Sequence, residues 1–301
     1  MLTRSRPPVG GAAAPGEWGR GRLVAALILL LLIALSLVAG VVLWVWLRFH
    51  PATTEATTSP APGSVSGPNG AAGGTVVASG GSIEQVRARR DALAAAPMAK
   101  SDLSKAQPSA LSVRDPGAIV LPASTSTGPV GIPSGFPHTS EGALAQLAAV
   151  DADVLNTASV DHARQVITGW AAPGGPTAQS WTGVQAIAGF LSAAKLSPAG
   201  GIGGSGGSGL VVRATPLMGM IKATDGPDWA VVCVEFEVDA TLKASGQVAI
   251  ADCQRMAWDA AGGADGGRWM VGPGAEPAPA PSIWPGTDAA IDAGWKDLRH
   301  A

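Results

Sequence analysis

The 301-residue chain contains no tyrosine, four phenylalanines and two cysteines, and only 14% of its residues are charged. Two cysteines are too few for a multi-disulfide scaffold or a four-thiolate zinc site. The net charge of −2 argues against a protein that coats nucleic acid, because such proteins carry a basic face. With few aromatic rings besides ten tryptophans, the core must consist mainly of aliphatic residues.

Recognisable catalytic motifs are also missing. There is no Gly-x-Ser-x-Gly nucleophile elbow at a turn from a predicted strand to a predicted helix, since the glycine-rich loop 200–209 leads into a strand and is interpreted as linker. The four histidines are scattered without metal-ligand spacing, at positions 50, 138, 162 and 300. Four polar residues do fall close together: Asp151, Asp153, Asp161 and His162. We interpret them as the exposed sides and ends of two helices rather than as a metal site. We therefore expect no catalytic residue, cofactor or metal in this chain.

A long apolar run predicts a membrane segment. Residues 23–47 contain no charge and would span about 37 Å as a helix, enough for a hydrocarbon core of about 30 Å. The basic tail, residues 1–22, predicts a cytoplasmic N-terminus and an extracytoplasmic C-terminal part. A cleaved secretion signal is the alternative, but its apolar region is normally about 7–15 residues long. An uncleaved single-pass anchor in the cell membrane is therefore favoured.

The segment after the anchor, residues 48–130, is rich in Pro, Gly, Ser and Thr and predicts a tether. Within it, Ser82 and Gln85 form a capping-box pattern that predicts a short helix near 83–96. The remainder, with repeated prolines and no clear period, is expected to be an extended arm. We therefore place the start of the folded domain near residue 131.

Residues 131–272 predict an α+β domain with helices followed by strands. Apolar spacing and polar caps indicate three helices, beginning after His138, Ser159 and about Trp181. Alternating apolar residues and turn signals then predict four strands of an antiparallel meander: 210–221, 229–240, 247–258 and 268–271. Residues 273–301 are expected to form a Pro-rich spacer and a last helix capped by Thr287, with Trp284 and Trp295 docked on the domain.

The two cysteines allow a test of strand register. If strands 229–240 and 247–258 form a hairpin centred on Lys243, opposed residues sum to 486, and so do Cys233 and Cys253. Directly opposed residues have Cα atoms about 4.5–5.5 Å apart, which admits a disulfide. The predicted extracytoplasmic location favours oxidation. Two buried free thiols remain the alternative, and a bulge would break the register.

Asp252 and Gln254 are the most suggestive polar pair. By strand alternation they share the helix-facing side with Met256 and Trp258. A carboxylate in an apolar cone can act as a proton acceptor, because burial raises its pKa. The alternative is a structural role, at a bulge or in a pair with an arginine such as Arg213. Residues 131–272 carry a net charge of −5, which disfavours direct nucleic-acid binding by the outer domain.

Four segments resemble a family of single-pass membrane proteins of integrative and conjugative elements in high-GC Gram-positive bacteria: residues 131–143, 170–176, 252–258 and 281–287. In layout the chain is also similar to the TcpC-like conjugation proteins and to bitopic scaffold proteins of type IV secretion systems. That resemblance implies a cone-shaped outer domain of the nuclear-transport-factor-two-like fold. The TcpC-like proteins carry two such domains, and this chain has room for one.

The resemblance implies a membrane-anchored scaffold of a conjugative DNA-transfer apparatus, without enzymatic activity. Its partners would be envelope or transfer proteins, or further copies of itself. An anchored small-ligand-binding or isomerase-like cone that uses Asp252 is the alternative from another class. An accessory protein of an Mce-type lipid-uptake system shares the same layout. A cone plugged by Phe236, Met256 and Trp258 would favour the scaffold, and an open cone the enzyme.

Overall fold

The computed structural model describes residues 82–198, 209–263 and 266–301, all of them within one compact unit, Val76–Ala301. The predicted basic tail, the predicted membrane helix and the first part of the predicted tether lie outside these residues. Among the helices that are described, none combines the length and apolarity that a membrane span requires.

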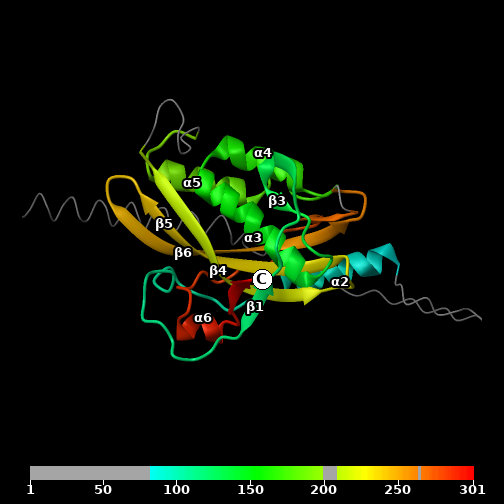
Figure 1. Ribbon diagram of the computed structural model, residues 1–301, viewed down its shortest axis with the longest axis horizontal. Helices are drawn as coiled ribbons and strands as arrows, with labels where there is room; N and C mark the ends of the chain where they lie inside the picture. Colours follow the sequence, from blue (N-terminus) through cyan, green and yellow to red (C-terminus); the bar gives the residue numbers. More distant parts are fainter. Residues whose placement is uncertain (1–81, 199–208, 264–265) are drawn as a thin grey trace, which may run out of the picture. The chain divides into compact units, whose positions relative to one another are not determined.

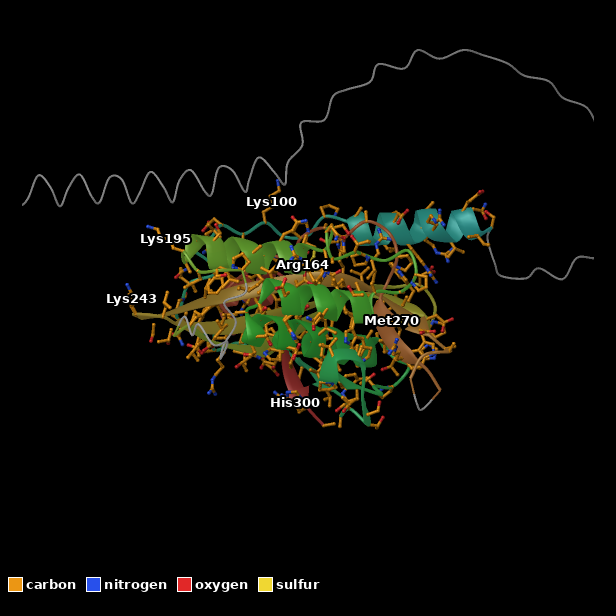
Figure 2. The ribbon with its side chains drawn as sticks, turned by 90° about the horizontal axis from the view of Figure 1, so that it is seen from above. Lys100, Arg164, Lys195, Lys243, Met270 and His300 are labelled. Carbon is orange, nitrogen blue, oxygen red and sulfur yellow. A yellow bond between two sulfur atoms is a disulfide. The ribbon has the colours of Figure 1, made fainter. Side chains whose placement is uncertain are left out.

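The centre of the fold is an antiparallel meander, which confirms the α+β class (Figure 1). Its strands are β4 (Val211–Thr224), β5 (Trp229–Thr241), β6 (Ser245–Asp259) and β7 (Arg268–Val271). All four match predicted strands to within a few residues at each end. Lys243 marks the turn between β5 and β6 (Figure 2). The long strands β4 to β6 curl, and two register shifts in β4 mark bulges of the kind that bends a strand.

Three helices cover one face of this sheet: α3 (Ser140–Thr157), α4 (Val160–Trp170) and α5 (Thr182–Ala193). The first two begin as predicted, because the side chains of Thr139 and Ser159 accept hydrogen bonds from backbone N–H groups in the first turn. The helices pack on the alternating apolar residues of β5, including Val234 and Phe236. One continuous core therefore lies between the helices and the sheet.

The opposite face of the sheet is also covered, which corrects the predicted domain boundaries. Helix α2 (Ile83–Ala95) forms with the expected capping box, but residues 97–130 are not a free arm. We call residues 96–117 the arm: its Ala106 is 2% exposed, and the Ala106 carbonyl accepts a hydrogen bond from the N–H of Ala249 on β6. The folded domain therefore begins with α2, well before residue 131.

The C-terminal residues, together with α2 and the arm, cover the sheet face opposite helices α3 to α5, and we call this cover the second layer. We call residues 273–287 the strap; it leads from β7 to α6 (Asp288–Asp292), the predicted helix capped by Thr287. Strand β8 (Lys296–His300) follows, pairing in parallel with β1 (Ala118–Leu121) and at two positions with β4. The sheet order is β1-β8-β4-β5-β6-β7. Trp284 and Trp295 are buried, which confirms the predicted docking.

Shorter elements connect arm and helices: β2 (Ser126–Thr127), η1 (Pro129–Gly131) and β3 (Pro133–Ser134). The close packing of β8 and α3 against β4 depends on Gly219. A Cβ atom there would come within 2.7 Å of Leu298 on β8 and 2.8 Å of Leu144 on α3. The absence of a side chain at this position leaves room for both leucines to pack against the same side of β4.

Arg255 joins the second layer to the sheet. It stands on β6, is 5% exposed, and donates to the Asp91 carboxylate on α2 and to the Ala275 carbonyl in the strap, both at 2.6 Å. Gly274 lies so close to the guanidinium that a Cβ atom would meet it at 2.6 Å. Helix α2 and the strap therefore share one buried cation as their common attachment.

Candidate functional site

Asp252 and Gln254 lie where strand alternation predicted them, on the helix-facing side of β6. The Gln254 side-chain amide donates to Asp252 Oδ2 at 2.9 Å, and Gln254 is 2% exposed. Asp252 as a residue is partly exposed, but its carboxyl group is enclosed. Arg213 is exposed on β4 opposite Asp239 and is not the partner of Asp252.

The structure adds a second carboxyl group, that of Asp151. Sequence analysis placed Asp151 on the exposed side of its helix, and that placement is wrong. The residue is 6% exposed, and its Oδ2 atom has no hydrogen-bond partner among the described residues. Its signal in the sequence was weak, because Asp151 falls within a run of alanines and valines whose buried and exposed positions look alike. Asp151 and Asp252 face each other between α3 and β6 closely enough for their charges to repel.

A third carboxyl group comes from Glu276 in the strap. It accepts a hydrogen bond at 2.8 Å from the N–H of Thr182, the first residue of α5. Burial raises its pKa, and the hydrogen bonds from Thr182 act in the opposite direction. Sequence analysis did not identify this residue, because only the fold of the strap brings position 276 beside β6. We refer to Asp151, Asp252 and Glu276 together as the carboxyl cluster.

The members of the carboxyl cluster differ in how firmly they hold a proton. Burial raises the pKa of Asp252 to about 6, with a further rise from the charge of Glu276; the hydrogen bonds from Gln254 and from the backbone at Cys253 lower it. Burial and repulsion by Asp252 raise the pKa of Asp151 well above the ordinary range. Of the two, Asp151 therefore holds its proton more tightly, and Asp252 is the group that ionises first as the pH rises. Such a pair can accept one proton and donate one hydrogen bond.

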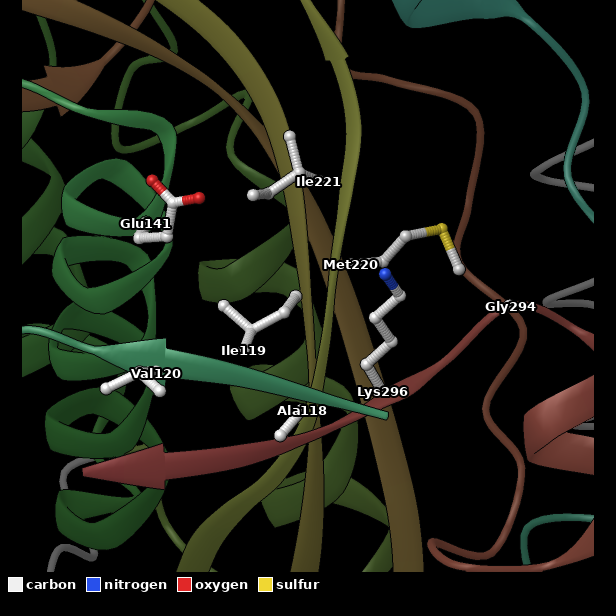
Figure 3. A pocket seen from close by; sticks show the side chains of 8 residues that line it. All are labelled: Ala118, Ile119, Val120, Glu141, Met220, Ile221, Gly294 and Lys296. Atoms are coloured by element: carbon white, nitrogen blue, oxygen red, sulfur yellow. The ribbon is translucent and has the colours of Figure 1, made fainter. Parts of the chain in front are cut away.

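The interior beside the carboxyl cluster is filled. Phe236 is 1% exposed, Met256 is fully buried, and Trp258 is partly buried against the same core. Two hollows of the described residues lie elsewhere. One, of about 520 Å³, is open to solvent between α3, β1 and β4, and Figure 3 shows Glu141, Ile119 and Lys296 around it. A second, of about 330 Å³, lies beside His138 and Trp269. Neither is lined by Asp252.

The other three residues that lie near Asp151 in the sequence, Asp153, Asp161 and His162, form ion pairs at or near the surface. His162 Nε2 lies 2.5 Å from Asp153 Oδ2, and Asp161 pairs with Arg164 on α4 at 3.1 Å. Within the described ranges, no three or more His, Cys, Asp or Glu side chains are arranged to hold a metal ion.

The disulfide prediction is confirmed. Cys233 and Cys253 stand directly opposite each other in the β5–β6 ladder and are joined by a disulfide. Both lie on the face away from the helices, as alternation required. That face is not exposed to water: the cysteines are covered by Ile283 of the strap and by Trp295. The disulfide therefore lies buried between the sheet and the strap, which is typical of a structural disulfide.

No protein-family model, curated protein or solved structure matches this chain. The resemblance to conjugation proteins therefore stays a prediction.

Proposed function

We propose that this chain is a single-pass membrane protein whose extracytoplasmic domain acts as a scaffold in a conjugative DNA-transfer apparatus. Its N-terminus lies in the cytoplasm, and its partners are envelope proteins or further copies of itself. The outer domain has the nuclear-transport-factor-two-like type of fold and makes no direct contact with nucleic acid. The assignment to DNA transfer depends on the four sequence segments that resemble conjugation proteins.

The observation that carries the scaffold proposal is the filled interior. Phe236 and Met256 occupy the space between sheet and helices in which an enzyme of this shape would hold its substrate. Both faces of the sheet are covered, so chemistry inside the domain has little room. Its surface in turn offers exposed apolar residues on the arm and β1, among them Val113 and Val120. Contacts at the surface are the function that such a molecule supports best.

The test is in-cell photocrosslinking of the full chain in a host that carries its native locus. A photoreactive phenylalanine analogue is placed at Val113 or Val120, with the buried Phe236 as the matched control position. We expect adducts with membrane components of the transfer apparatus from the exposed positions and none from the control. Adducts with lipid-uptake components alone, or no protein adducts, would contradict the proposal.

A second candidate function, binding and acid–base chemistry on a small ligand, is favoured by the carboxyl cluster. Asp151 holds a buried oxygen without a partner among the described residues, beside a carboxylate with a pKa of about 6. Ionised Asp252 would accept a proton from the ligand, and neutral Asp151 would donate a hydrogen bond to it. Native mass spectrometry of the full chain tests this. A retained small molecule that Asp252→Asn and Asp151→Asn lose, and exposed Asp161→Asn keeps, supports it; an empty wild-type chain contradicts it.

A further inference from the structure

A second buried carboxyl group lies on the other face of the sheet, at Glu235 of β5. Glu235 is fully buried beneath the strap. The N–H of Ile283 donates to Glu235 Oε1 at 2.5 Å, and Oε2 has no partner among the described residues. The strand neighbours of Glu235 are Met218 on β4 and Ala251 on β6, both apolar. The carboxyl group therefore joins sheet and strap inside an apolar layer.

Burial alone accounts for the proton affinity of Glu235. It raises the pKa of the carboxyl group to about 8, against a lowering effect of the Ile283 hydrogen bond. Ionisable groups on the surrounding elements do not contribute to this shift. Several of them bind elsewhere: Lys222 on β4, Glu237 on β5, Arg255 on β6, Glu276 in the strap, and Asp288 and Asp292 on α6. The others are exposed or partly exposed: Asp102 and Lys105 on the arm, Lys296 on β8, and Asp297 on β8 opposite Met218. At neutral pH, Glu235 is therefore an uncharged acid.

Strand pairing holds the sheet side of this contact, and individual hydrogen bonds hold the strap side. Glu235 stands between two long ladder strands, and the Cys233–Cys253 disulfide crosslinks β5 to β6 two residues away. The strap has no strand pairing near Ile283. Individual hydrogen bonds hold it, such as Ala251 N–H to Ser282 Oγ at 3.0 Å and Trp284 N–H to the Lys105 carbonyl at 2.7 Å. If Glu235 ionises, its charge must be hydrated, and we expect the strap rather than the paired strands to open for this hydration.

We propose that the Glu235 carboxyl group is a proton-dependent latch: its neutral form holds the strap on the sheet, and loss of the proton loosens the strap. The ionised carboxylate would have a full negative charge inside an apolar layer, with the Ile283 N–H as its one donor among the described residues. One hydrogen bond does not replace the hydration that a carboxylate loses on burial. Water reaches the carboxylate when residues around Ile283 lift, and the ladder beneath stays paired. Opening the strap uncovers an apolar sheet face that contains Met218 and the disulfide.

Hydrogen exchange of the intact full chain between pH 6 and 9.5, corrected for intrinsic exchange rates, tests the latch. In the wild type, protection of the amides of Ile283 and Trp284 should fall about tenfold per pH unit from pH 6 to about pH 8 and level off above it, while β5 amides stay protected. Glu235→Gln keeps the acceptor for Ile283 but cannot ionise, so its strap should stay protected throughout. Glu237→Gln, on the same strand and face, is the matched control and should behave as the wild type.

Three results would overturn the proposal. The first is strap protection in the wild type that does not change with pH. The second is a Glu235→Gln variant that loses protection as the wild type does. The third, which decides even if Glu235→Gln fails to fold, is simultaneous loss of protection in strap and β5, because that is unfolding of the whole sheet.

Discussion

At the scale of single residues, Asp252 gives the most direct test of the carboxyl cluster. Burial raises its pKa from 3.8 to about 6, so the folded state binds this proton more tightly than the unfolded state. The stability from this group is complete below pH 3.8 and is lost as the pH rises through 6. A shift of about two units corresponds to roughly 3 kcal/mol. Asp252→Asn keeps an acceptor for Gln254 without the charge, so it should gain up to about 3 kcal/mol at pH 8.

Urea denaturation of wild type and variant at pH 4 and pH 8 measures this gain. At pH 4 we expect little difference, because the wild-type carboxyl group is then neutral in the folded state. Asp161→Asn, which removes an exposed carboxylate, should show no comparable change between the two pH values. If Asp252→Asn raised the unfolding free energy equally at pH 4 and pH 8, burial of a charge could not be the cause of the gain.

Arg255 is the second residue whose environment makes a quantitative prediction. Removing its partner by Asp91→Ala leaves a buried guanidinium with the Ala275 carbonyl as its remaining acceptor. We expect a loss of about 1–3 kcal/mol in unfolding free energy. In an Arg255→Met background, where no buried charge remains, the same Asp91→Ala change should cost less than about 0.5 kcal/mol. Chemical denaturation of the four proteins gives the coupling, and equal costs in both backgrounds would contradict a buried ion pair.

The residues of the candidate site differ in how far sequence could predict them. Asp252 and Gln254 were found because a strand alternates strictly, so one correct residue fixes the face of all others. The same alternation puts Glu235 of β5 on the other face, but it does not predict that Glu235 is buried. That burial depends on the strap, which lies more than forty residues further along the chain. Strand alternation predicts on which face of the sheet a side chain lies, and tertiary packing decides whether that face is exposed to water.

At the scale of elements, the β5–β6 hairpin depends on its disulfide. The bond joins residues 20 apart and constrains the unfolded chain, for which we expect a contribution of about 3 kcal/mol. The double variant Cys233→Ala/Cys253→Ala should lose about this amount in urea denaturation, with far-UV circular dichroism unchanged because the ladder supplies the register. A loss below about 1 kcal/mol would mean that the unfolded hairpin already restricts the chain.

The elements that sequence predicted are those whose signals are local. Helix α4 begins where the sequence predicted, because Ser159 caps its first turn and an apolar stripe runs along one side. Strands β1 and β8 were missed, because each is short and β8 is polar, with the sequence Lys-Asp-Leu-Arg-His. Their parallel pairing joins residues about 180 positions apart and leaves no local pattern. The prolines of the arm, interpreted as a sign of a tether, fit equally well a chain that runs extended over a sheet.

At the scale of the whole molecule, buried carboxyl groups on both faces of the sheet predict a domain that is most stable in mild acid. Burial raises the pKa of Asp151, Asp252, Glu276 and Glu235. The folded state therefore holds more protons than the unfolded state above about pH 4, and the unfolding free energy falls as the pH rises. Ion-paired surface carboxylates such as Asp225 and Asp288 have lowered pKa values and oppose this trend only in stronger acid. Urea midpoints of the full chain should therefore be highest near pH 4 and fall as the pH rises to about 8, with a smaller fall between pH 6 and pH 8 in Glu235→Gln. A maximum at or above pH 8 would mean that these four groups are hydrated in the folded protein.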